Sequence, residues 1–358
     1  MKNFLILVTG GAGYIGSHVV RELQSCDYKV IVLDNLVYGH SYIVEEVLKV
    51  PLVISQAGCK KTLGRLLSGN HDACQGQKVD AVMHFAAYAY VGESVKDPAK
   101  YYRNNLCDTF NLLEALKEEG ERRGGPPVPI IFSSTCASYG IPSQNCNYIT
   151  ENSPQNPINP YGKSKLMSEQ IIKDFGSSYG MPSVIFRYFN AAGAHPSLDL
   201  GEDHTPETHL IPLIFDAISS KIENLQVYGR DYETPDGTCI RDFIHVSDIA
   251  IAHVLGLSHL LSNGGRYIFN LGSGKGYSVQ EIIDLTEEVT GFKVPRVYSD
   301  RREGDPPILV ASSDLAKRVL SWSPKYSDIK SIVLHAWNWY NKLNSLNPQA
   351  LSRTVKPN

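Results

Sequence analysis

The 358-residue sequence lacks the features that mark several large classes of protein. No stretch approaches the roughly 18 consecutive apolar residues that a membrane-spanning helix needs. Gly10 and Gly11 cut the apolar run at residues 4–8 short, so a first β-strand explains it better than a secretory signal. Lys and Arg are dispersed and the net charge is −3, which leaves no basic stripe for nucleic acid. We expect a cytoplasmic protein with no membrane or nucleic acid as partner.

Cysteine is sparse and shows no pairing pattern. The cysteines are odd in number and scattered, and no two form a Cys-x-x-Cys pair. They occupy positions 26, 59, 74, 107, 136, 146 and 239. This pattern predicts reduced, mostly packing thiols in a reducing compartment, rather than a disulfide framework or a zinc site. We therefore expect no metal site.

Strand-like and helix-like segments alternate through the first half of the chain. Runs rich in Val, Ile and Leu predict strands, and the amphipathic segments between them predict helices. The expected strands are residues 4–8, 29–34, 52–55, 81–85, 130–133 and 183–188, and the expected helices are 13–25, 101–119 and 160–179. Because the strands are apolar without a period of two, they should be covered on both faces. The pattern is typical of an α/β fold with a doubly wound parallel sheet.

The texture changes after about Asn190. Loops with Pro, Gly and His are followed by short helices, which we expect at residues 208–221, 246–261 and 279–290. A chain of this length usually divides into two domains. We predict a first domain at residues 1–190 with later segments returning to it, a smaller C-terminal α/β substrate domain at 191–343, and a C-terminal tail at 344–358.

Three glycines follow the first predicted strand at the spacing G-x-x-G-x-x-G. Gly10, Gly13 and Gly16 stand where that strand ends and the next helix begins. Glycine lets the backbone turn tightly and bring its N–H groups close to a pyrophosphate at the positive end of the helix. The motif alone is weak, but its position between strand and helix favours a dinucleotide site.

Asp34 ends the second predicted strand, about 20 residues after the glycines. An acid at this position accepts hydrogen bonds from the adenosine ribose hydroxyls and repels a 2′-phosphate. No Arg follows in Asp34-Asn35-Leu36-Val37, so NAD is favoured over NADP as the cofactor. The alternative, an Asp-Asn pair that only starts a turn, stays open.

Tyr161 and Lys165 stand four residues apart on the helix predicted at 160–179, which has Asn159 as its cap and Pro160 in its first turn. Their side chains therefore project from one face of the helix. A tyrosine titrates at about pH 10, and a nearby ammonium lowers that pKa toward the range of a general base. Standing alone, such a pair is more often a surface pair.

Small hydroxyl side chains end the preceding predicted strand, in the run 132–140 that contains Ser133 and Thr135. Ligands bind at the carboxyl ends of the strands in parallel sheets of this kind. Thr135 can hold a reacting hydroxyl there by a hydrogen bond, while the simpler alternative is a polar strand end before a turn. With Tyr161 and Lys165 on the next helix, the segment favours a catalytic role in which the dinucleotide takes up the substrate's hydrogen.

Over nearly its whole length the sequence resembles the UDP-glucose 4-epimerases, a family of the extended short-chain dehydrogenase/reductase superfamily. The matching runs are residues 9–17, 34–36, 84–87, 91–95, 102–105, 161–167, 187–190, 193–196, 241–246 and 301–305. The resemblance implies a Rossmann fold, NAD as cofactor and interconversion of UDP-glucose and UDP-galactose. In that reaction C4 is oxidised, the 4-keto sugar rotates about its link to the nucleotide, and it is reduced on the opposite face. The resemblance also implies a homodimer through a helix bundle that includes residues 101–119.

Carried over residue by residue, the resemblance implies Tyr161 as the proton acceptor, Lys165 as the group that lowers its pKa and binds the nicotinamide ribose, and Thr135 as the partner of the sugar O4. The implied cofactor residues, besides Tyr161 and Lys165, are Gly10, Gly13, Tyr14, Ile15, Gly16, Asp34, Asn35, Tyr38, Gly39, Phe85, Ala86, Ala87, Asn104, Ser133, Tyr188 and Phe189. The implied substrate residues, besides Thr135, are Asn190, Leu210, Val227, Tyr228, Arg241, Arg302, Asp305 and Leu309. The two arginines suit a diphosphate as paired forks, although surface salt bridges are the commoner role of Arg.

Three positions depart from the family pattern. Ala57 stands where the family has an Asp that reaches the adenine, and Ala89 stands where it has a Lys that touches the cofactor. We hypothesise that NAD is held less tightly than in relatives that purify with it bound; stoichiometric NAD after extensive dialysis would remove this idea. Leu309 stands at the wall position whose bulk decides whether N-acetylated sugars fit, which predicts UDP-glucose and UDP-galactose as main substrates and leaves N-acetylhexosamines undecided.

The same fold also supports other functions. A 4,6-dehydratase needs an Asp-Glu pair directly after the Thr, and this chain has Cys136-Ala137 there. A UDP-uronate epimerase or decarboxylase needs only extra groups for a carboxylate and stays open. A NAD-sensing regulator without chemistry is disfavoured because Thr135, Tyr161 and Lys165 are all present.

Overall fold

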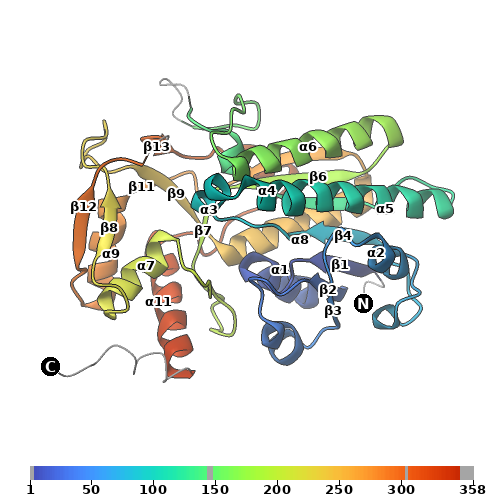
Figure 1. Ribbon diagram of the computed structural model, residues 1–358, viewed down its shortest axis with the longest axis horizontal. Coiled ribbons are helices and arrows are strands. Elements are labelled where there is room, and N and C mark those ends of the chain that lie inside the picture. Colours follow the sequence, from blue (N-terminus) through green and yellow to red (C-terminus); the bar gives the residue numbers. More distant parts are fainter. Residues whose placement is uncertain (1–3, 143–147, 303–304, 347–358) are drawn as a thin grey trace.

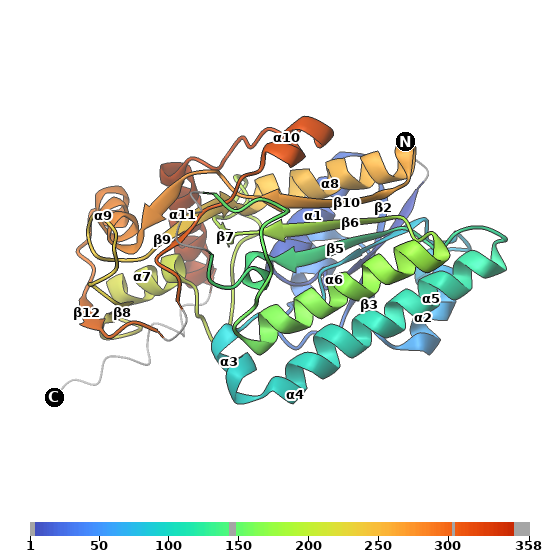
Figure 2. The same cartoon turned by 90° about the horizontal axis from the view of Figure 1, so that it is seen from above.

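The computed structural model describes residues 4–142, 148–302 and 305–346. A central parallel sheet lies between two layers of helices, and a group of short strands and helices adjoins one end of it (Figure 1; Figure 2). The seven strands of the sheet run in the order β10-β6-β5-β4-β1-β2-β3. Their bounds are β1 Leu5–Thr9, β2 Lys29–Asp34, β3 Leu52–Ile54, β4 Ala81–His84, β5 Ile130–Thr135, β6 Ser183–Tyr188 and β10 Arg266–Leu271. The prediction of a doubly wound parallel sheet is confirmed.

The strand order reverses direction between β1 and β4. The chain builds outward from β1 to β2 and β3, then continues on the other side of β1 with β4, β5 and β6. Ligands bind in sheets of this type at the carboxyl ends of the strands beside such a switch point. The topology therefore directs attention to the loops that follow β1 and β4.

Helices cover both faces of the sheet and bury its apolar side chains. One face packs against α1 (Tyr14–Ser25) and α8 (Val246–Asn263), and the other against α2 (Lys60–Leu67), α5 (Asp108–Arg122) and α6 (Pro160–Tyr179). The central strands β1, β4 and β5 are buried along their whole length, as their lack of alternation predicts. The edge strand β3 differs, because Ile54 is 66% exposed.

Local signals set the limits of α6 as predicted. The Asn159 side chain accepts a hydrogen bond from the Gly162 N–H at 2.8 Å, and Pro160 opens the first turn. Gly180 ends the helix with a φ of +69°, which glycine adopts without strain. Other bounds shifted slightly, since β1 begins at Leu5 rather than residue 4 and β5 continues to Thr135.

Two predicted helices differ from the structure. The segment 101–119 is not one helix: α4 (Pro98–Tyr101) is followed by a π-helical segment, η3 (Tyr102–Cys107), and then by α5. The helix predicted at 208–221 is the shorter α7 (Leu210–Ile218), because His209 has an extended backbone with φ −89° and ψ 146°. The remaining short helices are η1 Ile43–Leu48, η2 Asp72–Cys74, α3 Val91–Lys96 and η4 Cys136–Ser138.

The C-terminal half adds small sheets and a separate core. Strand β9 (Ile240–His245) pairs with β7 (Asn190–Ala192), β11 (Gly276–Ser278) and β13 (Ile308–Leu309), and β8 (Leu225–Tyr228) pairs with β12 (Arg296–Ser299). One apolar core lies on each face of the large sheet. Apolar side chains of α7, α9 (Val279–Thr290) and α11 (Ile329–Leu346) form a third core. In contrast, β10, α8 and α10 (Asp314–Leu320) pack with the large sheet. Helix α11 continues past Asn344, where the tail was expected to begin, and residues 347–358 lie outside the described chain.

No helix in the described ranges is long and apolar enough to cross a membrane. The six described cysteines are free thiols, and Cys146 lies outside the described residues.

Candidate active site at the carboxyl end of the sheet

The glycine loop after β1 packs directly against the end of β4. Gly10 has a φ of +72°, and a Cβ on it would lie 2.5 Å from the backbone nitrogen of Ala86. A Cβ on Gly16 would lie 2.1 Å from the carbonyl oxygen of Gly10. Both contacts are with backbone, so neither position accepts a side chain without moving the chain.

The first turn of α1 is arranged to receive an anion. Gly13 is the N-cap residue, and no side chain in the described residues caps this turn. The space beside Gly13 is open, since the nearest atom to a Cβ there would be the Gly10 oxygen at 3.5 Å. Uncapped N–H groups at a helix N-terminus bind phosphate. The predicted residues Gly10, Gly13, Tyr14, Ile15 and Gly16 therefore fit the pyrophosphate of a dinucleotide.

Asp34 joins the end of β2 to the glycine loop. Its Oδ2 accepts a hydrogen bond from the Ala12 N–H at 3.0 Å, and its Oδ1 accepts one from the Leu36 N–H at 2.9 Å. The residue is only 7% exposed, and burial raises the pKa of its carboxyl group. A Cβ on Gly39 would lie 3.1 Å from the Asp34 Oδ1. Asn35 follows Asp34 and donates to the Gln56 Oε1 at 3.2 Å. These predicted residues therefore lie together beside the glycine loop.

Tyr161, Thr135 and Lys165 meet where β5 ends and α6 begins. The Tyr161 hydroxyl is hydrogen-bonded to the Thr135 side chain, and the Lys165 Nζ donates to the Ser133 carbonyl oxygen at 2.7 Å. The Ser133 hydroxyl is in turn hydrogen-bonded to the Tyr188 hydroxyl. The sequence thus identified side chains that the fold brings to one place.

The electrostatics of Tyr161 and Lys165 differ from the simple expectation. Burial raises the pKa of Tyr161, the Tyr188 hydroxyl raises it further, and the hydrogen bond with Thr135 lowers it. Lys165 is not among the described groups that lower this pKa. Burial lowers the pKa of Lys165 itself to about 7. Deprotonation of Tyr161 therefore requires positive charge beyond what the surrounding side chains place at its oxygen.

A second group of predicted residues lies on the C-terminal side. Arg241 on β9 forms an ion pair with Asp305, and the Arg302 guanidinium lies 4.1 Å from the ring centre of Tyr228 at the end of β8. Leu309 is 8% exposed and packs in one cluster with Phe189 and Cys136, next to Thr135. This cluster connects the two groups.

The other predicted residues are placed less directly. The Asn190 side chain donates to the Asp242 carbonyl oxygen at 2.7 Å, and Asn104 donates to the Asn105 Oδ1 at 2.9 Å. Leu210 is the first residue of α7. Val227 is 1% exposed as a whole residue, backbone included, and lies in the third core, so it offers no exposed surface for the predicted contact with substrate.

The sequence is similar to proteins of known function. Residues 6–272 match the sequence profile of the NAD dependent epimerase/dehydratase family. The UDP-glucose 4-epimerase of Halalkalibacterium halodurans is 44% identical over 337 residues, which are 94% of this chain and 96% of that protein.

The fold agrees with solved structures. The UDP-glucose 4-epimerase from Brucella ovis in complex with NAD is 44% identical and has a TM-score of 0.84, over 94% of this chain and 98% of that one. The enzyme from Stenotrophomonas maltophila, with bound NAD and formylated UDP-arabinopyranose, is 34% identical and has a TM-score of 0.88, over 96% of this chain and all of that one. The chain belongs to the NAD dependent epimerase/dehydratase family.

Two polar side chains beside the predicted cofactor residues were not predicted from the sequence. The Lys100 Nζ donates to the Tyr38 hydroxyl at 2.9 Å and to Glu93 at 2.6 Å, and it lies 4.6 Å from the ring centre of Tyr88. Lys100 thus brings a cation close to the segment in which Ala89 carries none. Asn105 accepts from the Tyr88 N–H and donates to the Tyr88 carbonyl, which fixes the segment after Phe85, Ala86 and Ala87.

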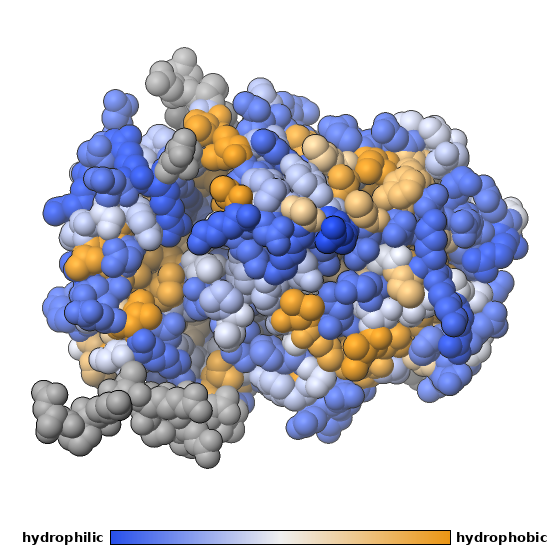
Figure 3. All heavy atoms as spheres, viewed as in Figure 1, coloured by the Kyte–Doolittle hydropathy of each residue, from blue (hydrophilic) through white to orange (hydrophobic). Residues whose placement is uncertain are grey.

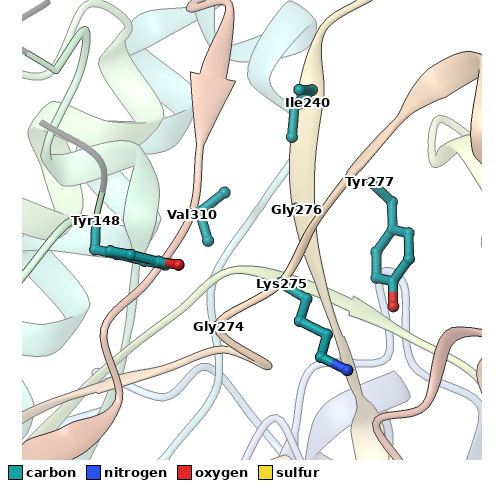
Figure 4. Close-up of a pocket in the computed structure, with 7 residues that line it drawn as sticks. All are labelled: Tyr148, Ile240, Gly274, Lys275, Gly276, Tyr277 and Val310. Atoms are coloured by element: carbon teal, nitrogen blue, oxygen red, sulfur yellow. The ribbon is translucent and has the colours of Figure 1, made fainter. Parts of the chain in front are cut away.

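A shallow cavity of about 500 Å³ lies away from this site (Figure 4). The described residues that line it come from β9, β11, the segment before β11, the segment after β13 and the loop between η4 and α6: Tyr148, Ile240, Gly274, Lys275, Gly276, Tyr277 and Val310. Successive side chains of a strand point to opposite faces. Ile240 therefore faces the cavity while its neighbour Arg241 faces away from it, so the cavity and the ion pair of Arg241 with Asp305 lie on opposite faces of the small sheet.

Proposed function

We propose that this protein is an NAD-dependent UDP-glucose 4-epimerase, an isomerase that interconverts UDP-glucose and UDP-galactose. C4 of the hexose is oxidised, the 4-keto sugar rotates about its link to the nucleotide, and it is reduced on the opposite face. The observation that carries the proposal is the meeting of Tyr161, Thr135 and Lys165 at the end of β5. The relatives of this name, 44% identical over nearly the whole chain, support it.

The chain's own residues prepare the cofactor site. The uncapped N–H groups of the glycine loop receive the pyrophosphate, Asp34 accepts hydrogen bonds from the adenosine ribose, and Lys165 binds the nicotinamide ribose. Phe85, Ala86, Ala87, Asn104 and Phe189 line the remaining wall. NAD⁺, when bound by these residues, would supply the electron acceptor for C4 and a positive charge.

Tyr161 moves the proton. Thr135 holds the sugar O4 by a hydrogen bond, and Tyr161 accepts the O4 proton as C4 becomes a ketone. Burial raises the pKa of Tyr161, and a positive charge near its oxygen would offset that effect, because an opposite charge stabilises the phenolate. Tyr161 returns the proton to O4 when C4 is reduced again, so the net redox change is zero.

The nucleotide half of the substrate is anchored on the C-terminal side. Arg241 and Arg302 bind the diphosphate of the substrate. The diphosphate then replaces Asp305 as the ion-pair partner of Arg241. Tyr228, Asn190 and Leu210 hold the uridine. Leu309 bounds the sugar pocket, with UDP-glucose and UDP-galactose as the main substrates and the N-acetylated forms undecided.

The proposal includes the organisation of the chain. Residues 1–190 bind NAD together with later segments, residues 191–343 bind the UDP-sugar, and the protein is a cytoplasmic homodimer. A dimer through α5 and α6 is supported by apolar side chains that gather over these helices (Figure 3), among them Phe110, 38% exposed, and Met167, 44% exposed. Light scattering after gel filtration tests the dimer. A measured mass equal to that of a single chain would contradict it.

The reaction is tested with purified protein and UDP-galactose, with and without added NAD. We expect UDP-glucose as product while net NADH stays near zero. Stoichiometric release of NADH would instead mark a dehydrogenase. A strong dependence of the rate on added NAD supports the weaker cofactor retention expected from Ala57 and Ala89.

A further inference from the structure

Four side chains between β7 and α7 converge on one point, and none of them is among the predicted site residues. Glu202, His204, Glu207 and His209 each offer one ligand atom, and these atoms all lie within 4.8 Å of one another. They stand in eight consecutive residues, in the order Glu-x-His-x-x-Glu-x-His. The scattered cysteines gave no reason to expect a metal here, because this group contains none.

The separations of these atoms suit a small tetrahedral ion. The His209 Nδ1 lies 2.7 Å from the Glu202 Oε1 and 3.1 Å from the Glu207 Oε1. The His204 Nδ1 lies 3.1 Å from the Glu202 Oε1 and 3.9 Å from the Glu207 Oε2. Zinc bonds of about 2.0–2.2 Å at tetrahedral angles separate neighbouring ligand atoms by roughly 3.3 Å. The observed separations lie on both sides of that value.

The two carboxylates of the group are largely buried. The side chains of Glu202 and Glu207 are only 7% and 12% exposed, and that of His204 is 17% exposed. Two buried carboxylates beside two imidazoles form a set that a divalent cation neutralises.

Surrounding elements hold the segment in place. The Trp339 Nε1 of α11 donates to the Glu202 carbonyl oxygen at 2.9 Å, and the His40 Nε2 lies 3.0 Å from the Asp203 carbonyl oxygen. The His204 ring lies edge-on to the rings of Tyr14 and Tyr90, each at 6.0 Å between centres. Contacts with other elements therefore help to position the ligands, in addition to the contacts that the ligands make with each other.

We propose that Glu202, His204, Glu207 and His209 form a binding site for one divalent transition-metal ion of the zinc class. Imidazole and carboxylate ligands together favour zinc and its neighbours over magnesium or calcium. Four protein ligands close the coordination shell, which is typical of a structural ion rather than a catalytic one. The site does not rest on the proposed epimerase reaction.

The ion links two parts of the active site. His204 contacts Tyr14 in the first turn of α1, and the Tyr14 hydroxyl donates to the Gly193 carbonyl oxygen at 2.6 Å. His209 directly precedes Leu210, which begins α7 on the nucleotide side. A bound ion would fix the position of this helix relative to the glycine-loop helix.

The test is metal binding to the full-length chain without an affinity tag. Protein stripped with a chelator is titrated with Zn²⁺ and with Mg²⁺, and bound metal is counted by mass spectrometry after gel filtration. We expect one Zn²⁺ per chain, a higher Tm with Zn²⁺, no stoichiometric Mg²⁺, and with Co²⁺ the intense visible bands of a four-coordinate ion.

Two ligand variants and one matched control locate the ion. Glu202→Gln and His204→Gln should each weaken Zn²⁺ binding by more than about 100-fold, since even partners outside the ligand shell are worth roughly 10–100-fold. His195→Gln removes a histidine that pairs with Asp199 outside the group and should leave binding unchanged. Absence of stoichiometric Zn²⁺, equal binding of Mg²⁺, or unchanged affinity in both ligand variants would overturn the proposal. If a variant fails to fold, the Co²⁺ spectrum of the unaltered chain still decides, because weak six-coordinate bands contradict the site.

Discussion

The two sides of the proposed active site are formed by different kinds of groups. On the cofactor side, backbone and buried groups dominate: the glycine loop presses on Ala86, Asp34 is bonded to that loop, and Lys165 is buried against Ser133. On the nucleotide-sugar side, long side chains dominate, and the pair Arg241 and Asp305 is 13% and 26% exposed. Substitutions on the first side should therefore disturb folding or chemistry, whereas those on the second should change substrate affinity alone.

The largest effect should follow removal of the Tyr161 hydroxyl. Tyr161→Phe keeps the ring but leaves no group to accept the O4 proton, so kcat should fall by about 10²–10⁴-fold. Steady-state rates with UDP-galactose measure this. Tyr179→Phe is the control, since Tyr179 lies exposed at the other end of α6. Equal rates for the two variants would contradict a proton transfer by Tyr161.

The glycine loop offers a matched pair of substitutions. Gly16→Ala forces a Cβ to within 2.1 Å of the Gly10 oxygen, which should lower the free energy of unfolding by about 1–3 kcal/mol and weaken NAD binding. Gly64→Ala in α2 meets no atom within 4 Å and should raise it by about 1 kcal/mol, because alanine favours a helix. Urea unfolding and NAD titration check both. The same sign for the two changes would break the comparison.

Adjacent arginines test the nucleotide side. Arg302 lies over the Tyr228 ring at 4.1 Å, and Arg301 lies over the Tyr232 ring at 4.3 Å. Arg302→Met should weaken UDP binding about 10–100-fold with little change in Tm, because charge-assisted hydrogen bonds to the diphosphate are lost. Arg301→Met removes an exposed pair with Asp231 and should leave the affinity for UDP unchanged. Calorimetric titration with UDP decides, and an equal loss in both variants would refute the assignment.

Burial of Lys165 predicts a pH dependence of stability. Burial lowers its pKa to about 7, whereas a lysine in the unfolded chain titrates near about 10.4. Between these values the unfolded chain binds more protons, so stability rises with pH by up to about 1.4 kcal/mol per pH unit, and the slope vanishes below the folded pKa. Lys165→Met should remove this slope from urea unfolding measured at several pH values. The exposed Lys163→Met on the same helix should retain it, and an unaltered slope in Lys165→Met would contradict the account.

The smallest effect concerns the sugar pocket. Leu309→Ser should raise kcat/KM for UDP-N-acetylgalactosamine relative to UDP-galactose by up to about tenfold, because it removes bulk at the pocket wall. Ile308→Ser, at a 41% exposed neighbouring position, should leave that ratio unchanged. Competition assays measure the ratio directly. A preference of the unaltered protein for the N-acetylated substrate would already overturn the expected order.

Elements with local signals could be predicted from the sequence, and those shaped by distant contacts could not. The limits of α6 follow from Asn159, Pro160 and Gly180, which act within a few residues. The π-helical segment η3 depends on packing instead: Asn105 within it is bonded to Tyr88 and to Ser164 on α6. Helix α7 begins at Leu210, because the side chains of the preceding residues Glu207 and His209 contact the other members of the histidine and glutamate group.

The same division holds for the site. Gly10, Asp34, Thr135 and Tyr161 could be found because strand ends of a parallel sheet meet at one edge. Lys100 could not, since its contact with Tyr38 joins residues 62 positions apart and its segment carries no motif. The burial of Val227 in the third core was equally invisible, because it depends on which face of a short strand packs inward.

The most direct test of the account follows the hydrogen at C4. UDP-galactose that carries deuterium at C4 is converted in ordinary water in a single turnover, and the product is analysed by mass spectrometry and NMR. The account predicts a slower chemical step and UDP-glucose that retains the deuterium at C4. Exchange of the label with water, or a chemical step as fast as with the unlabelled sugar, would contradict oxidation and reduction at this carbon.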